Sequence, residues 1–352
     1  MDSLSASVVG GGTGGRLSLR AFADSPRFHL AAVTDLRPEV RQDLAAAFPG
    51  IETYPTHEEM FAARPTDVIC VSTYPPSHEP IALDALRLPL LGILVEKPLG
   101  HTTASGRRIL EAVRARGLPM GVPHGLLAKR APLEILERVR RGEIGDLRLV
   151  EIQCSGWDII NAGIHWLNYF VTLTNNEPLA HVLACCDAST RTYRDGMQVE
   201  TLAVTYAQTR SGVRVVMNTG DDVRINAAGK QFLFQLVGTR GVIEFYGWDH
   251  AYRVMNAAFP DGQMFTPEEF AVSGHRRHLE AMAAMIERGA PDYTIPESSL
   301  LALEICEGAY LSSRHTCAVT FPVDEFTPPP APQWQPGDPY AGEGGGRDGR
   351  AL

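Results

Sequence analysis

Four polar side chains fall on one face of a helix that the sequence predicts near residues 157–168. They are Asp158, Asn161, His165 and Asn168. Their spacing of i, i+3, i+7 and i+10 aligns side chains along a helix, and the residues between them are mostly apolar. Histidine titrates near neutral pH, so it can accept the proton of an alcohol. Such a row either faces solvent or lines a site, and four aligned polar groups favour a site.

A glycine-rich segment near the N-terminus has the spacing that a dinucleotide phosphate requires. Gly10, Gly12 and Gly15 form the pattern G-x-G-x-x-G between an apolar run and a helical pattern. The first glycine permits the tight turn, the second lets the backbone approach the pyrophosphate, and the third lets helix and strand pack closely. The helix N-terminus supplies N–H donors. The predicted phosphate contacts are Gly10, Gly12, Thr13, Gly14 and Gly15.

Asp35 makes this weak motif more specific, because it ends the second predicted strand twenty residues after Gly15. An acid at this place accepts hydrogen bonds from the ribose hydroxyls and repels a 2′-phosphate. The sequence therefore favours NAD as the cofactor. Arg37 is close enough to leave NADP as the alternative.

The other predicted strand ends add candidate ligands, because open parallel sheets bind ligands outside the carboxyl ends of their strands. These ends contribute Ser72, Thr73, Pro75, His78, Glu96 and Lys97 as predicted cofactor contacts. Lys97 belongs to an EKP tripeptide that directly follows the buried run GILV. A solvated charged loop is the alternative interpretation of this tripeptide.

Strand and helix patterns alternate through residues 1–122, which predicts a Rossmann domain with a doubly wound parallel sheet. Residues 123–326 hold strand-like runs with few long helices between them. This predicts an α+β domain with a large, open, mostly antiparallel sheet, partly covered by helices near 275–288 and 298–312. Residues 327–352 are rich in proline and glycine, which predicts a mobile tail or an arm ordered by a partner subunit.

Composition limits the class of protein. A length of 352 residues suggests two domains, and a net charge of −9 argues against nucleic-acid and anionic-membrane partners. The six cysteines have no disulfide-like spacing, the chain shows no signal peptide, and no apolar stretch is long enough for a bilayer. We therefore expect a cytoplasmic protein without a membrane partner.

Several of these segments together resemble the Gfo/Idh/MocA family of sugar and cyclitol oxidoreductases. They are residues 8–15, Asp35, the run DVICVSTYPPSHEPIALDAL, LVEKP, and GEIG at 142–145. The resemblance implies that Lys97 is the active-site lysine and that residues 73–78 line the nicotinamide pocket. It also implies a sugar or cyclitol substrate and an open sheet used for oligomer contacts, so we expect a homodimer or homotetramer.

The family pattern D-x-G-x-H is changed in this chain, because Asn161 stands where the acid is expected four residues before His165. An amide cannot share a proton, so we expect His165 to be the base, Lys97 to stabilise the developing alkoxide, and Asn161 to orient substrate. The glycine after His124 stands where relatives often carry arginine. Predicted substrate contacts are His124, Trp157, Asp158, Asn161 and His165.

Three functions remain open at this point. The first is a dehydrogenase or reductase acting on a secondary alcohol or ketone. The second is a transient-redox enzyme that oxidises a sugar, eliminates a glycosidic group and returns the hydride. The third is a non-catalytic dinucleotide-binding protein. Two histidines and an acid at 275–280 resemble metal ligands, but the proposed chemistry needs no metal and we expect none.

Overall fold

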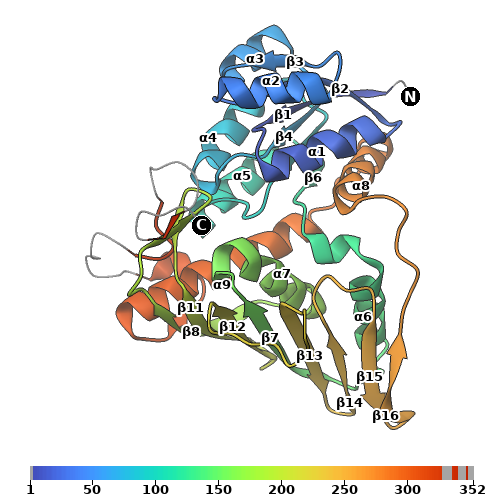
Figure 1. The fold of residues 1–352 in the computed structure, drawn as a ribbon, viewed down its shortest axis with the longest axis vertical. Helices are drawn as coiled ribbons and strands as arrows, with labels where there is room; N and C mark the ends of the chain where they lie inside the picture. The colour runs from blue at the N-terminus through green and yellow to red at the C-terminus, as the bar shows by residue number, and fades with distance from the viewer. Residues whose placement is uncertain (1–2, 327–334, 340–345, 348–352) are drawn as a thin grey trace. The chain divides into compact units, whose positions relative to one another are not determined.

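The chain forms two compact units in a computed structural model that describes residues 3–326, 335–339 and 346–347 (Figure 1). The first unit comprises residues 1–123 and 272–297, and the second comprises residues 124–271 and 298–352. The chain therefore crosses between units at Pro123, one residue from the predicted boundary, and returns to the first unit for one later segment. The sequence pattern did not indicate that return.

The first unit contains a six-stranded parallel sheet, which confirms the predicted Rossmann fold. Its strands are β1 (Leu4–Val9), β2 (Phe28–Thr34), β3 (Glu52–Tyr54), β4 (Val68–Val71), β5 (Gly92–Val95) and β6 (Met120–Gly121). They lie in the order β3-β2-β1-β4-β5-β6, which reverses direction beside β1 and β4. The carboxyl ends of β1 and β4 flank that switch point, which is where such sheets bind dinucleotides.

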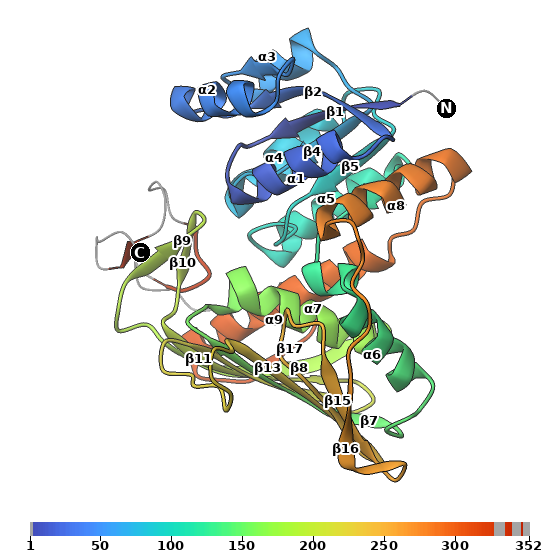
Figure 2. The ribbon, with the colours of Figure 1, turned by 45° about the vertical axis from the view of Figure 1, so that its right-hand side comes forward.

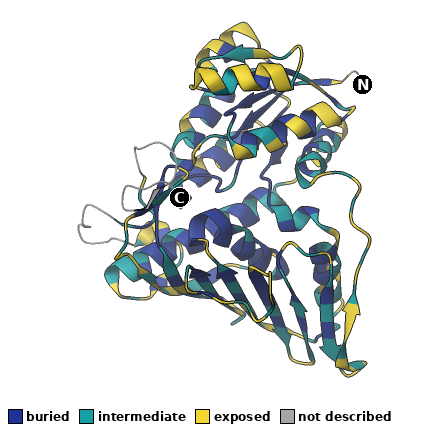
Figure 3. Ribbon diagram, viewed as in Figure 1, coloured by how far each residue is buried: buried dark blue, intermediate teal, exposed yellow. Residues whose placement is uncertain are grey.

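Helices connect these strands: α1 (Thr13–Asp24), α2 (Pro38–Ala47), α3 (His57–Ala63), α4 (Pro75–Ala85) and α5 (Thr103–Ala115). Local sequence explains where several begin. Pro38 and Pro75 occupy first-turn positions, where a missing N–H costs nothing. Thr102 and Ser105 form a reciprocal capping box at the start of α5. The residues of β4 and β5 are all buried, as expected for inner strands of a parallel sheet (Figure 3).

Helix α8 (Gly274–Arg288) packs in the first unit, against α1 and β5. Leu279, Met282 and Ala283 are buried in the core of the Rossmann unit, and Gly92 leaves room for Met282. The expectation that this helix covers the second sheet was therefore wrong. Its apolar stripe shows that one face is buried, but a stripe carries no information about which sheet covers it.

The second unit contains a nine-stranded mixed sheet with the order β16-β15-β14-β13-β7-β12-β11-β8-β17. Its strands are β7 (Leu147–Ser155), β8 (Leu179–Asp187), β11 (Leu202–Thr209), β12 (Arg214–Gly220), β13 (Phe232–Gly238), β14 (Gly241–Phe245), β15 (Tyr252–Asn256), β16 (Phe259–Phe265) and β17 (Val319–Thr320). Only the β7–β12 pair is parallel. This confirms the predicted large, mostly antiparallel sheet. The sequence pattern indicated neither β15 nor β16. The proline and glycine of β16 are tolerated because it is an edge strand (Figure 2).

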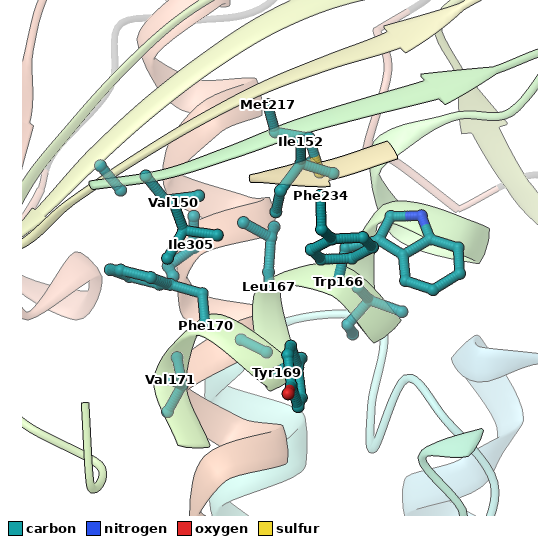
Figure 4. Packing of buried hydrophobic residues seen from close by; sticks show 14 of the residues in the cluster. Val150, Ile152, Trp166, Leu167, Tyr169, Phe170, Val171, Met217, Phe234 and Ile305 are labelled. Carbon is teal, nitrogen blue, oxygen red and sulfur yellow. The ribbon is translucent and has the colours of Figure 1, made fainter. Parts of the chain in front are cut away.

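Helices α6 (Arg130–Arg140), α7 (Ile164–Leu173) and α9 (Thr294–His315) belong largely to this second unit. Side chains of α7 pack directly on the sheet (Figure 4). The Trp166 ring lies 5.3 Å from that of Phe234, and Phe170 and Leu167 are fully buried beside Ile152. This core holds α7 rigidly, so polar residues on its remaining surface are firmly placed.

A short hairpin, β9 (Thr192–Arg194) and β10 (Met197–Val199), is joined by residues of the predicted tail. Residues 335–339 bond to Gln198 and Arg314, and β18 (Gly346–Arg347) pairs with β9. The other parts of the tail lie outside the described residues. Within the described ranges, the chain contains no helix with the length and hydropathy needed to cross a membrane.

Candidate active site

The glycine loop between β1 and α1 is shaped by three different requirements. Gly10 has a φ of +100°, and a Cβ there would lie 2.3 Å from the Ser72 carbonyl oxygen. A Cβ at Gly15 would lie 1.8 Å from the Gly10 oxygen, so both positions need glycine for the fold. Gly12 differs, because a Cβ there meets no atom within 4 Å. The loop is therefore open at Gly12, where a pyrophosphate would approach the backbone.

Asp35 lies beside this loop at the end of β2. Its carboxylate accepts hydrogen bonds from the Gly11 N–H at 2.9 Å and from the Arg37 guanidinium at 3.0 and 3.1 Å. Burial acts to raise the pKa of Asp35, but the hydrogen bonds from Arg37 and Gly11 outweigh it and hold the pKa below its ordinary value. An ionised acid therefore stands beside the glycine loop, paired with a half-exposed arginine.

His78 holds together the loops that follow β4 and β5. Its ring is fully buried, with Nδ1 2.9 Å from the Pro98 carbonyl oxygen and Nε2 2.9 Å from that of Thr73. Burial lowers the pKa of His78, so the neutral ring donates one N–H. The ring thus faces two backbone carbonyls, and the structure places His78 as a support for residues 73 and 98.

Glu96 and Lys97 follow β5, and Glu96 has a partner that is 179 positions away in the sequence. Its Oε1 lies 3.0 Å from His275 Nε2 of α8, and its carboxylate also packs against Gly14. Burial acts to raise the pKa of Glu96, while His275 and Lys97 hold it below the ordinary value. His275 is one of the residues that resembled a metal ligand, and it instead supports the base of the glycine loop.

The polar row of the second unit begins at a π-helical turn, Ile159–Gly163, that precedes α7. Asp158 caps this turn: its Oδ1 accepts from the Asn161 backbone N–H at 2.8 Å and from Asn161 Nδ2 at 2.9 Å. Its Oδ2 accepts from Arg194 at 3.0 Å. Asn168 is fully buried and donates to Ser298, so the row is not continuous beyond His165.

A second buried carboxylate, Glu200, lies under the same turn. It accepts from the Ile159 N–H at 2.7 Å and from the Tyr310 hydroxyl at 2.9 Å. Burial, together with the charge of Asp158, raises the pKa of Glu200 to about 7. No motif surrounds Glu200 in its strand-like run, so the sequence alone does not indicate its place under this turn.

Aromatic rings surround His165. The ring of His124 lies 5.5 Å away and that of Trp248 lies 5.6 Å away, both edge to face. His124 is buried, with Nε2 2.9 Å from the Ser299 hydroxyl. Trp157 is exposed, and the Arg194 guanidinium lies over its ring at 4.4 Å. No local pattern in the sequence could have placed Trp248 beside His165.

These residues fit a nicotinamide dinucleotide. The open loop at Gly12 and the N-terminus of α1 would hold the pyrophosphate, and the ionised Asp35 would accept from the adenosine ribose. In the second unit, His165 has the chemistry of a proton acceptor, next to an amide, Asn161, whose Nδ2 is held by a carboxylate.

Residues 4–124 match the family model described as the oxidoreductase family with an NAD-binding Rossmann fold. The rhizopine catabolism protein MocA of Rhizobium meliloti is 28% identical over 49% of this chain and 57% of its own length. An inositol 2-dehydrogenase of Acidiphilium cryptum is 26% identical over 67% of this chain and 74% of its own. An uncharacterised oxidoreductase of Bacillus subtilis is matched over 40% of its own length. The chain therefore spans about half the length of this protein and of MocA.

Solved structures share the fold over almost the whole chain. GenD2 from gentamicin A biosynthesis, in complex with NAD, has a TM-score of 0.75 at 22% identity and covers 91% of this chain and 97% of its own. Levoglucosan dehydrogenase, in complex with NADH and levoglucosan, has a TM-score of 0.76 at 16% identity. The match covers 91% of this chain and 100% of that protein's chain. Residues 4–124 thus match the oxidoreductase family with an NAD-binding Rossmann fold, and the chain as a whole shares the fold of these solved structures.

Proposed function

We propose that the protein transfers a hydride between NAD and a secondary alcohol or ketone of a sugar, sugar derivative or cyclitol. The observation that carries the proposal is the ionised Asp35 beside a glycine loop that is open at Gly12. The inositol dehydrogenase and levoglucosan dehydrogenase among the similar proteins support a ring polyol as the substrate class.

The chain's own residues handle the alcohol and its proton. Bound NAD supplies the acceptor for the hydride that leaves the alcohol carbon with its electron pair. In this proposal His165 takes the hydroxyl proton, and the Lys97 ammonium stabilises the alkoxide that develops on the same oxygen. Asn161 orients a substrate hydroxyl, because its amide is held on one side by Asp158. No metal is assigned a role, since the lysine fills the place of a Lewis acid.

NAD is the proposed cofactor in preference to NADP. The ionised Asp35 opposes a 2′-phosphate by charge repulsion, and the nearest guanidinium, that of Arg37, is already bonded to this carboxylate. The repulsion by Asp35 and its pairing with Arg37 both disfavour NADP, because the paired guanidinium offers little net positive charge to a 2′-phosphate.

The activity test is incubation of the purified protein with NAD and a panel that contains myo-inositol and levoglucosan. Net NADH supports the proposal. Product without net NADH, with solvent deuterium beside the oxidised carbon, would instead indicate the transient-redox chemistry. NADH binding without any turnover would indicate a non-catalytic protein. The Lys97→Ala variant should lose turnover while its NADH affinity stays nearly intact, and an active variant would remove the lysine from the mechanism.

We also propose that the protein is a homodimer or homotetramer that associates through the outer face of the nine-stranded sheet. That face carries the exposed apolar side chains Leu183 and Val204, which are each 49% exposed. Size-exclusion chromatography with light scattering tests it: Val204→Glu should shift the protein to monomer, and a monomeric wild type would exclude the proposal.

All six cysteines are free thiols, which supports a reducing compartment such as the cytoplasm.

A further inference from the structure

We propose that Trp248 is the platform on which a ring-shaped polyol lays its C–H face, beside His165. This inference rests on the proposed function and adds a residue that determines the substrate class. It assigns the site to six-membered-ring polyols in preference to open-chain polyols of the same size.

Trp248 lies in the loop that follows β14, and its surroundings are those of a binding surface. Its ring centroid lies 5.6 Å from that of His165 and 4.9 Å from that of Trp166, yet the residue is 38% exposed. An exposed tryptophan leaves a large apolar face in water, which costs free energy unless a ligand covers it. The partly exposed ring is next to the predicted base of the reaction.

The position of the ring is prepared by a neighbour with no side chain. A Cβ at Gly125 would lie 2.7 and 2.8 Å from two carbons of the Trp248 ring. Any larger residue at 125 would therefore displace the ring. The loop is held from the other side by hydrogen bonds from Lys129 to the Trp248 carbonyl and from Lys230 to Asp249. These contacts hold the ring in place before a ligand binds.

Trp248 suits this role better than the other two tryptophans that the structure describes. Trp166 is fully buried in the sheet core and cannot reach a ligand. Trp157 is exposed, but the Arg194 guanidinium lies over its ring at 4.4 Å. A saccharide C–H face needs an aromatic face that no cation covers.

The chemistry of the platform selects rings. The face of an aromatic ring carries partial negative charge, and the C–H groups on one side of a pyranose or cyclitol carry partial positive charge. A ring polyol can lay several of them on one flat surface, with its hydroxyls directed outward.

Binding measurements on the NAD-saturated full chain test the inference. The probes are myo-inositol and levoglucosan as rings and D-sorbitol as the open-chain comparison. Ligand-observed NMR, with saturation of the protein's aromatic protons, should transfer most strongly to ring C–H protons on one face. Trp248→Ala should weaken ring binding about tenfold and D-sorbitol binding about twofold or less, while Trp248→Phe should stay within about threefold.

Two further variants distinguish the loss of the ring's position from a general loss of structure. Gly125→Ala keeps the indole but displaces it, so it should weaken ring binding as Trp248→Ala does. Met264→Ala, at an exposed residue of β16, should change nothing. Equal losses for rings and D-sorbitol, full ring binding by Trp248→Ala, or a wild type that binds neither ring at 10 mM would each overturn the inference. Ring binding without NADH formation would contradict the proposed activity and leave the platform intact.

Discussion

Asp158 Oδ1 accepts two hydrogen bonds from Asn161, from the backbone N–H at 2.8 Å and from the side-chain Nδ2 at 2.9 Å. A carboxylate accepts and cannot donate, so the amide must turn its nitrogen toward Asp158. The aspartate that the family pattern would place at position 161 is therefore replaced by a residue that suits its neighbour. An acid at 161 would face another acid at hydrogen-bonding distance.

Asn161→Asp should destabilise the protein increasingly as the pH rises. The new carboxylate would sit against the carboxylate of Asp158, so its folded pKa would lie above its unfolded value, and ionisation above about pH 4 would favour unfolding. We expect a loss of about 3 kcal/mol at pH 8 and little loss at pH 4, measured by urea unfolding. Adding Asp158→Asn to the same chain should restore most of the unfolding free energy that is lost at pH 8.

Asn168→Asp is the matched control for that cycle, because Asn168 is buried on the same helix and its amide bonds to Ser298. It should also cost stability, since it buries a new charge. Asp158→Asn should not rescue it. Equal rescue of both variants would show that Asn161 and Asp158 are not specifically coupled.

Glu200 should make wild-type stability fall between about pH 5 and pH 8. Burial and the charge of Asp158 raise its pKa from the ordinary 4.5 to about 7. A folded pKa above the unfolded one contributes stability that is present below the unfolded pKa and is lost as the pH rises through the folded pKa. Relative to Glu200→Gln, the wild type should lose about 3 kcal/mol over this range. Parallel pH profiles of the two proteins would contradict the raised pKa.

Gly12→Ala and Gly15→Ala should separate cofactor binding from folding. A Cβ at Gly12 meets no atom, so the unfolding free energy should stay within about 0.5 kcal/mol while NADH binding, measured by fluorescence, is lost. A Cβ at Gly15 would collide with the Gly10 carbonyl, so that variant should be destabilised by about 3 kcal/mol or more. NADH binding by Gly12→Ala at wild-type affinity would place the pyrophosphate elsewhere.

Asp35→Ser should shift the cofactor preference toward NADP. The substitution removes the charge that opposes a 2′-phosphate and releases the Arg37 guanidinium, which is bonded to Asp35 in the wild type. The ratio of NADPH to NADH affinity should rise by about a hundredfold, measured by fluorescence titration. Asp43→Ser, which removes an exposed acid that is paired with Arg16, should leave the ratio unchanged. An unchanged ratio in Asp35→Ser would show that this acid does not set the preference.

The parts of the fold that depend on local patterns could be predicted from the sequence. The apolar runs of β4 and β5, the prolines that begin α2 and α4, and the glycine loop each depend on neighbours a few residues away. The alternation of strands and helices then leaves the parallel sheet as the one arrangement that buries every strand. The predicted polar row did not extend to Asn168, because that residue is fully buried and donates to Ser298 of α9.

By itself, the sequence determined that a Rossmann unit opens the chain, that its loop suits a dinucleotide, and that an amide precedes His165. Only the tertiary structure decided which residues work together: His275 with Glu96, Arg194 and Glu200 with the Asp158 turn, and Trp248 with His165. The two residues of each pair lie between 36 and 179 positions apart in the sequence, in different elements of the fold. Local periodicity reports which face of an element is buried, whereas these pairings depend on which elements the hydrophobic core brings together.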